Sequence, residues 1–359
     1  MKKNALSLVF PALVLFAAST SARAGLMITP TFDTTITTNP AGAAIEGVID
    51  NAISFYEATF SNNIDVSIYF QVGGGLGESD TGYTYLQTYT NYYNGLVANN
   101  ANPTAIASLG GPDGGNDPVL GNSMISVNSA DSRAVGLGGA GLCIVTAGDT
   151  TPATGVPNHC DQSGNPNNNG QVVDGIISLN TYITTPPGTQ TNPAIYYSLM
   201  AVTEHEIDEV LGLGSSLPNT ASSTAIVGPP ANISPEDLFR YSTNSMGTIT
   251  GRSTLTENCA SPGTAVFSIN GISPLTGFNN SCNGADWGDW LGGDPTYGAQ
   301  VQDAYGTPGA TETLGPNEIQ ALTAIGYIQT APEPSTFVLL FGSLAGSLAL
   351  IGLVRRRRN

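Results

Sequence analysis

The sequence predicts an α+β fold in which helices and strands alternate ahead of one long helix and a loop-rich C-terminal region. Apolar residues recur at helical spacing over residues 43–60 and alternate as in a strand over residues 64–72. After residue 214 the composition changes, because Ser, Thr and Pro become frequent. We therefore expect a mixed, twisted sheet with its helices in residues 25–214 and a second, loop-rich subdomain in residues 215–330.

Further elements are predicted on the same grounds. We expect a second helix over residues 83–97 and a helix over 316–326 that Pro316 starts and Gly326 stops. The remaining expectations are strands at 123–127, 173–179 and 266–270, a helical turn at 130–135, and loops rich in Asn, Gly and Pro at 98–122 and 141–170.

Both ends of the chain carry features of export. A basic start, an apolar run and an Ala-x-Ala site indicate a signal peptide over residues 1–24. Residues 337–354 are uncharged and precede four Arg, which fits a marginal membrane span with its basic end inside. Residues 331–359 are therefore expected to form a tail with a membrane segment.

The charge of the chain excludes one class of partner. The formal net charge is −17 at pH 7, and between the two ends the only basic residues are Arg133, Arg240 and Arg252. Such a chain would repel the phosphate backbone, so nucleic acid is excluded as a partner. Cations, by contrast, are favoured.

The four cysteines suggest two local disulfides. An exported chain meets an oxidising compartment, and the cysteines fall in two pairs along the sequence. We expect Cys143 to pair with Cys160, and Cys259 to pair with Cys282. A cysteine metal site is the poorer interpretation, since no Cys-x-x-Cys occurs.

Residues 192–212 are predicted to form the helix on which function depends. Asn192 suits the cap, Pro193 the first helical position, and Gly212 a left-handed residue that ends the helix. Four carboxylates crowd its C-terminal end, with no Lys or Arg between Arg133 and Arg240. These acids oppose the helix dipole and repel one another. A bound divalent cation would relieve both effects.

The spacing inside this helix is that of a metal site. His205 and Glu209 stand four residues apart, so one helical face presents both to the same ion. Glu206 lies about 100° around the helix, where it can act as general base on the attacking water. The alternative is a solvated, acidic helix end with an incidental His.

A catalytic zinc site needs a third protein ligand. Asp237 is favoured, because it follows a loop of suitable length beyond the helix; its alternative roles are a helix cap or a partner for Arg240. Tyr241 is a candidate oxyanion donor. Asp286 and Asp289, flanked by two Trp, are expected to line the cleft or to bind Ca²⁺. The full set of candidates for the third ligand is Asp237, Asp286, Asp289, Ser215 and His159.

The motif His205-Glu206-x-x-Glu209-x-x-Gly212 resembles the zincin helix His-Glu-x-x-His-x-x-Gly, with Glu in place of the second His. Pro332-Glu333-Pro334, its apolar run and its Arg cluster resemble the PEP-CTERM sorting signal of Gram-negative bacteria. With the segments at 237–242 and 288–290, these features make the chain similar to a family of PEP-CTERM-tagged, zincin-like metalloproteases.

The resemblance implies a zincin-like fold and a secreted or surface-sorted endopeptidase that hydrolyses extracellular proteins with Zn²⁺ or another divalent ion. Signal peptidase and exosortase would process the chain, after transient anchoring in the inner membrane. The strand at 174–180 would lie along the cleft and pair with substrate, although an internal position in the sheet fits its sequence equally. The alternative function is that of a non-catalytic, acidic, cation-binding surface or matrix protein on the same scaffold.

Overall fold

The computed structural model describes residues 25–81, 85–139, 141–145, 170–185, 193–216, 226–227, 231–253, 257–258, 264–280, 285–293 and 296–330. The expected signal peptide, the Pro332-Glu333-Pro334 tail and His159 lie outside these residues. So do Cys160, Cys259 and Cys282 and the side chain of Cys143, so the two disulfides stay predictions. No helix of the described part combines the length and apolarity that crossing a membrane requires.

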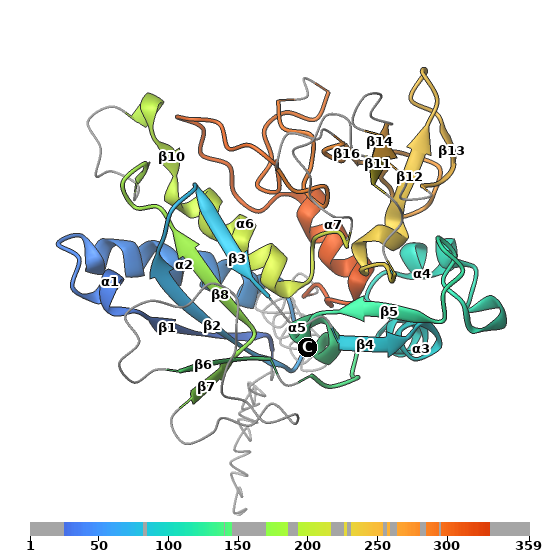
Figure 1. Cartoon of the computed structure of the whole chain (residues 1–359), viewed down its shortest axis with the longest axis horizontal. Helices are drawn as coiled ribbons and strands as arrows, with labels where there is room; N and C mark the ends of the chain where they lie inside the picture. The colour runs from blue at the N-terminus through green and yellow to red at the C-terminus, as the bar shows by residue number, and fades with distance from the viewer. Residues whose placement is uncertain are drawn as a thin grey trace, which may run out of the picture.

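The described chain is α+β, as predicted, and its main sheet is mixed (Figure 1). The strand order is β1 (Met27–Phe32), β2 (Asp65–Val72), β8 (Gly175–Leu179) and β3 (Gly77–Asp80). β1, β2 and β8 are parallel, whereas β3 runs antiparallel to β8. β8 therefore lies inside the sheet, and β3 rather than residues 174–180 forms the edge.

Two helices pack against each other and against this sheet (Figure 1). α2 (Gly42–Thr59) buries Ile45, Ile49 and Ala52, the residues whose spacing predicted it. α6 (Leu199–Leu211) contacts α2, β8 and β3. The predictions of a helix at 43–60 and a strand at 64–72 are confirmed.

The predicted helix at 192–212 is too long at its start. Residues Pro193–Ile195 form one 3₁₀ turn, and β10 (Tyr197–Ser198) pairs with β9 (Thr184–Thr185). The helix begins after Ser198, whose hydroxyl accepts a hydrogen bond from the backbone N–H of Ala201 at 3.2 Å. The end was correct, since Gly212 takes a positive φ of 124°.

The C-terminal region is built on a second small sheet. Its order is β13 (Ile249–Arg252), β12 (Arg240–Thr243), β15 (Ala265–Phe267) and β16 (Thr276–Gly277), with antiparallel neighbours throughout. α7 (Pro316–Ile325) packs against α6 and confirms the helix predicted at 316–326. The strand predicted at 266–270 starts one residue earlier and ends at Phe267.

The middle of the chain differs most from expectation. The helix predicted at 83–97 starts only at Tyr89, because residues 85–88 form a strand. The loop predicted at 98–122 contains a helix that Asn102 caps and Pro103 starts. The elements in this part are β4 (Tyr85–Thr88), α3 (Tyr89–Asn99), α4 (Pro103–Leu109), β5 (Met124–Val127), α5 (Ser129–Ala134), β6 (Leu142–Val145) and β7 (Gly170–Val173). The short helix α1 (Thr34–Thr37) lies nearer the start of the chain.

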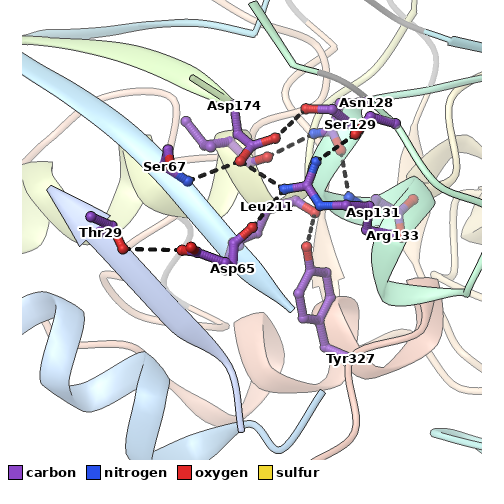
Figure 2. Close-up of polar contacts among 12 residues, drawn as sticks. Thr29, Asp65, Ser67, Asn128, Ser129, Asp131, Arg133, Asp174, Leu211 and Tyr327 are labelled. Carbon is purple, nitrogen blue, oxygen red and sulfur yellow. Dashed lines mark hydrogen bonds and ion pairs between the residues drawn. The ribbon is translucent and has the colours of Figure 1, made fainter. Parts of the chain in front are cut away.

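An ion pair joins α5 to the sheet (Figure 2). The Nη2 of Arg133 donates to Asp174 Oδ2 at 2.7 Å and to the carbonyl of Asp65 at 2.8 Å. The same carboxylate accepts from the backbone N–H of Ser67 at 2.9 Å and from the hydroxyl of Ser129 at 2.5 Å. This buried carboxylate thus has a donor for each oxygen, which keeps its desolvation cost low.

The C-terminal end of α6 is held from two sides (Figure 2). The side-chain amide of Asn128 donates to the carbonyls of Glu209 at 3.2 Å and Val210 at 2.9 Å. The hydroxyl of Tyr327 donates to the carbonyl of Leu211 at 2.8 Å. Helix ends leave carbonyls without helical partners, and these two side chains satisfy three of them. The position of the helix that carries His205 is therefore fixed.

A fully buried carboxyl lies behind this helix end. The Tyr92 hydroxyl is 3.0 Å from both Asp131 Oδ2 and the carbonyl of Ile325, yet it has one proton to donate. A protonated Asp131 resolves this, because it donates to Tyr92 while Tyr92 donates to Ile325. Burial raises the pKa of Asp131 well above its usual value, which favours this protonated form.

We expect Asp131→Asn to stabilise the metal-free protein increasingly as pH rises. The pKa of Asp131 is higher in the folded than in the unfolded chain, so its protonation stabilises the fold. This stabilisation is complete below pH 3.8, the usual pKa, and is lost as the pH rises from there toward the pKa of the folded chain. Asn cannot titrate, so in that window the free energy of unfolding of the variant should rise relative to that of the wild type by about 1.4 kcal/mol per pH unit. Urea unfolding from pH 4 to pH 8 measures the difference. The exposed control Asp50→Asn should show none, and a pH-independent difference for Asp131→Asn would mean that the carboxyl is ionised.

Candidate metal centre

A cavity of about 250 Å³ lies along one face of α6, from Ala201 to Glu209. Its walls are the edge strand β3, the helix itself, the segment around Asp286 and Asp289, and residues 300–307 with Glu312. Three helix side chains, His205, Glu206 and Glu209, face it. Each of these three has a donor atom within 4.8 Å of the donor atoms of the other two.

His205 has one ring nitrogen fixed and the other directed at acids. Its Nδ1 lies 2.9 Å from the backbone carbonyl of Val301, which can only accept, so the proton belongs on Nδ1. Nε2 lies 3.6 Å from Glu209 Oε1 and 3.7 Å from Asp289 Oδ1. Burial lowers the pKa of His205, but Asp289 and Glu209 outweigh it and raise the pKa well above its usual value.

The surroundings of His205 shift the pKa values of Glu209 and Glu206 in opposite directions. Ser79 on β3 donates to Glu209 Oε2 at 2.6 Å, which leaves Oε1 toward His205. Burial raises the pKa of Glu209, yet hydrogen bonding and charge from His205, with Ser79, lower it overall. Burial and the charge of Glu209 raise the pKa of Glu206 well above its usual value. In the absence of an ion, a proton therefore resides on Glu206 before it resides on Glu209.

Gly77 on β3 is required by this arrangement. A Cβ at this position would collide with the carboxylate of Glu206 and with Val202. The missing side chain lets the edge strand approach the helix directly, and it brings Ser79 within reach of Glu209.

The loop that carries Asp289 is anchored in the core. Trp287 and Trp290 are fully buried, and the Arg240 guanidinium donates to the carbonyl of Trp287 at 2.6 Å. The backbone N–H of Asn279 donates to the carbonyl of Asp289 at 2.8 Å. Gly288 lies so close to Gly214 and Ser215 that a Cβ would collide with their backbone. The sharp exit from α6 thus supports the loop that brings Asp289 to His205.

The neighbours of His205 and Asp289 are also linked to α7. Gln302 Nε2 donates to Asp289 Oδ1 at 3.2 Å. Glu318 accepts from the backbone N–H of Val301 at 3.0 Å. This places the carbonyl of Val301 against His205 and the amide of Gln302 against Asp289, so the C-terminal region orients both side chains.

Two of the four acids at the helix end do not belong to the cavity. Glu204 and Asp208 are fully buried on another face, where Glu204 Oε2 accepts from the backbone N–H of Leu314 at 2.9 Å. The Tyr56 hydroxyl lies 2.7 Å from both Asp208 Oδ1 and the carbonyl of Glu204. A protonated Asp208 satisfies this geometry, as at Asp131. An ion in the cavity would therefore relieve Glu206 and Glu209, not all four acids.

Asp237, the favoured third ligand, is not among the residues that line the cavity. It accepts from the hydroxyls of Ser215 at 2.6 Å and Ser234 at 2.7 Å, and from the backbone N–H groups of Ser216 and Ser234. Its carboxylate therefore fastens the loop that leaves α6. It does not cap a helix, because Asp237 lies inside the 3₁₀ turn Glu236–Phe239, where Pro235 holds the cap position. Ser215, another candidate, is engaged in the same contact.

The other candidates are divided. Tyr241, the candidate oxyanion donor, lies on β12, is 4 % exposed, and packs under the guanidinium of Arg252 at 4.9 Å. It does not line the cavity. Asp286 lines the cavity beside Asp289, and its side chain is partly exposed. The structure thus brings together His205, Glu206, Glu209 and Asp289, and it leaves Asp237 and Tyr241 elsewhere.

Sequence reasoning missed Ser79, Val301 and Gln302, which hold Glu209, His205 and Asp289 in turn. Ser79 lies in Gly-Glu-Ser-Asp, a polar stretch with little strand propensity, so no pattern marked it. The contact of Val301 runs through a backbone carbonyl and carries no sequence signal. Compared with known proteins, the chain matches no family model, no curated protein and no solved structure.

Proposed function

We propose that this protein is an exported metal-dependent endopeptidase of zincin-like architecture, with His205, Glu209 and Asp289 as metal ligands and Glu206 as general base. The observation that carries the proposal is the direction of His205. Its Nδ1 is fixed by Val301, and its Nε2 lies 3.6 Å and 3.7 Å from one oxygen each of Glu209 and Asp289.

Both distances from His205 Nε2, 3.6 Å to Glu209 and 3.7 Å to Asp289, are slightly longer than the separation of two ligands on one tetrahedral zinc ion. Asp289 is not in the group of donors that lie within 4.8 Å of one another, so its carboxylate would have to move toward Glu209 when the ion binds. Zinc lies about 2.0–2.2 Å from nitrogen and oxygen ligands, so two ligands of one ion are separated by roughly 3.3–3.5 Å. Each donor is also oriented from behind: His205 by Val301, Glu209 by Ser79, and Asp289 by Gln302. Such supporting contacts are typical of metal sites. One imidazole with two carboxylates is a hard ligand set, so another divalent ion competes with zinc.

The surroundings favour peptide as the substrate. β3 lies at the edge of the main sheet and beside the cavity, so an extended peptide would add to it as a further strand. This supports the zincin-like assignment, with β3 in the place predicted for residues 174–180. The cavity is large enough for a side chain next to the scissile bond.

An ion held by these residues would polarise the scissile carbonyl and lower the pKa of the attacking water. Glu206 stands within reach of the other two helix side chains and takes the proton of that water. It then passes the proton to the leaving amine. The raised pKa of Glu206 in the ion-free chain, which burial and the charge of Glu209 cause, supports this role. No oxyanion donor is assigned, since Tyr241 lies elsewhere.

We expect Glu206→Gln to keep the metal and lose turnover. The amide cannot accept the proton of the attacking water, so cleavage of a protein substrate such as casein should fall by a factor of about 10² or more. Metal content by mass spectrometry and the rate of cleavage are measured on the same samples. Glu46→Gln on α2 is the matched control and should change neither.

The same experiment separates the alternative function. If the wild-type protein binds metal and cleaves nothing, the non-catalytic, cation-binding surface or matrix protein is supported and the endopeptidase is excluded. The observation in favour of that alternative is the net charge of −17.

The third ligand is tested by comparing two aspartates. We expect Asp289→Ala to weaken zinc binding about tenfold or more, because it removes an oxygen next to His205 Nε2. Asp237→Ala should leave zinc affinity unchanged and lower thermal stability instead, since its carboxylate holds Ser215 and Ser234. Competition with a chromophoric chelator measures the affinity. The reverse result would restore Asp237 as the ligand.

A further inference from the structure

The cavity carries more negative charge than an ion would neutralise. Besides the residues proposed to act on the metal, its lining includes Glu78 on β3, Asp286, Asp303 and Glu312. The lining includes no Lys or Arg. A divalent ion would be balanced by Glu209 and Asp289 alone, so the remaining carboxylates stay uncompensated with the ion bound.

One of these carboxylates is buried and incompletely satisfied. Asp303 is 5 % exposed, and its Oδ2 accepts from the backbone N–H of Gln300 at 3.0 Å. Its Oδ1 has no hydrogen-bond partner in the described residues. Burial raises the pKa of Asp303 to about 6, against the bond from Gln300 and with help from Glu318 and Glu312. The carboxylate is therefore mostly ionised at neutral pH, and leaving it unpaired is costly.

Apolar surface lies beside these charges. Leu76 and Val202 line the same cavity, and so does Tyr305, which is 51 % exposed. Lys and Arg side chains combine a long apolar stem with a cationic end. The ring of Tyr305 suits the stem or the cation, and the carboxylates suit the charge. Neutral or acidic side chains match only part of this lining.

A second metal ion would be another way to neutralise the acids. The described residues contain one group of three His, Cys or carboxylate donors within 4.8 Å of one another, and that group is His205, Glu206 and Glu209. Glu78, Asp303 and Glu312 are not part of such a group. Carboxylates spread over separate walls fit a long organic cation better than a compact metal ion.

We propose that the cavity takes the Lys or Arg side chain of a peptide next to the scissile bond, with Glu78, Asp303 and Glu312 as its counter-charges. This specificity rests on the proposed endopeptidase function and deepens it. The protein would then cleave basic segments of extracellular proteins and reject acidic ones. A negative cleft also raises the association rate of cationic peptides, and salt screens this effect.

The test uses the zinc-loaded protein and fluorogenic peptides that differ at one position, occupied by Lys, Arg, Gln or Glu and moved along both sides of the scissile bond. At one position we expect kcat/KM for Lys or Arg to exceed that for Gln about tenfold and that for Glu about 100-fold. This ratio should shrink as salt is raised to about 0.5 M. Equal kcat/KM values for the four peptides would overturn the inference and leave the endopeptidase intact.

Two double variants locate the preference. Glu78→Gln with Glu312→Gln should reduce the Lys-to-Glu ratio about tenfold. Glu46→Gln with Asp50→Asn removes the same number of negative charges, but from α2, and should leave the Lys-to-Glu ratio unchanged. If both pairs lower the ratio equally, overall charge causes the preference and the inference fails. If the double variant of the cavity does not fold, the single variants Glu78→Gln and Glu46→Gln provide the same decision, because Glu78 lines the cavity and Glu46 lies on α2.

A failure of the proposed function is recognised separately. If no peptide is cleaved, the endopeptidase is excluded, and fluorescence anisotropy of the labelled Lys and Glu peptides then measures binding alone. Tighter binding of the Lys peptide, lost in the Glu78 and Glu312 variant, supports the cavity as a site for basic side chains. Equal binding of the two peptides overturns it.

Discussion

The structure depends on burying an acid-rich helix that has no Lys or Arg near it in the sequence. Every carboxylate of α6 must then find a hydrogen-bond donor, a proton or an ion. Glu204 takes a backbone N–H from Leu314, and Asp208 pairs with Tyr56 through a proton. Both partners come from distant segments, so satisfying this helix requires that α2 and the C-terminal region assemble around it. The functional face of α6 is exposed to the cavity because the opposite face is closed in this way.

The same logic explains why the cavity lies between the two halves of the chain. β3 supplies Ser79 to Glu209, whereas the C-terminal region supplies Asp289 and the carbonyl that orients His205. Neither half holds the cluster alone. Glycines allow the approach on both sides, since Gly77 admits the edge strand to Glu206 and Gly288 admits the Asp289 loop to the turn after α6. A change in either contact should therefore affect the cluster around His205 from a distance.

Sequence reasoning recovers what regular spacing determines. The apolar pattern of α2 and the i, i+4 pair of His205 and Glu209 are local properties, and the structure contains both the helix and the pair. The third acid depends on long-range packing, and the loop length that favoured Asp237 over Asp289 carries no information about that packing. Burial of two Trp brings Asp289 to the site, while three serines hold Asp237 away. β3 was missed for a related reason, because its strand geometry comes from pairing with β8 rather than from its own residues.

The proposed site holds a single ion over α6 with one imidazole and carboxylate oxygens. X-ray absorption spectroscopy of the zinc-loaded protein measures this coordination directly. We expect one zinc per chain, with one nitrogen ligand from His205 and oxygen for every other ligand, all at about 2.0–2.2 Å. The His205→Ala variant should lose the imidazole signal together with the ion. Sulfur scattering at about 2.3 Å, or no zinc bound at micromolar concentration, would contradict the proposed metal site.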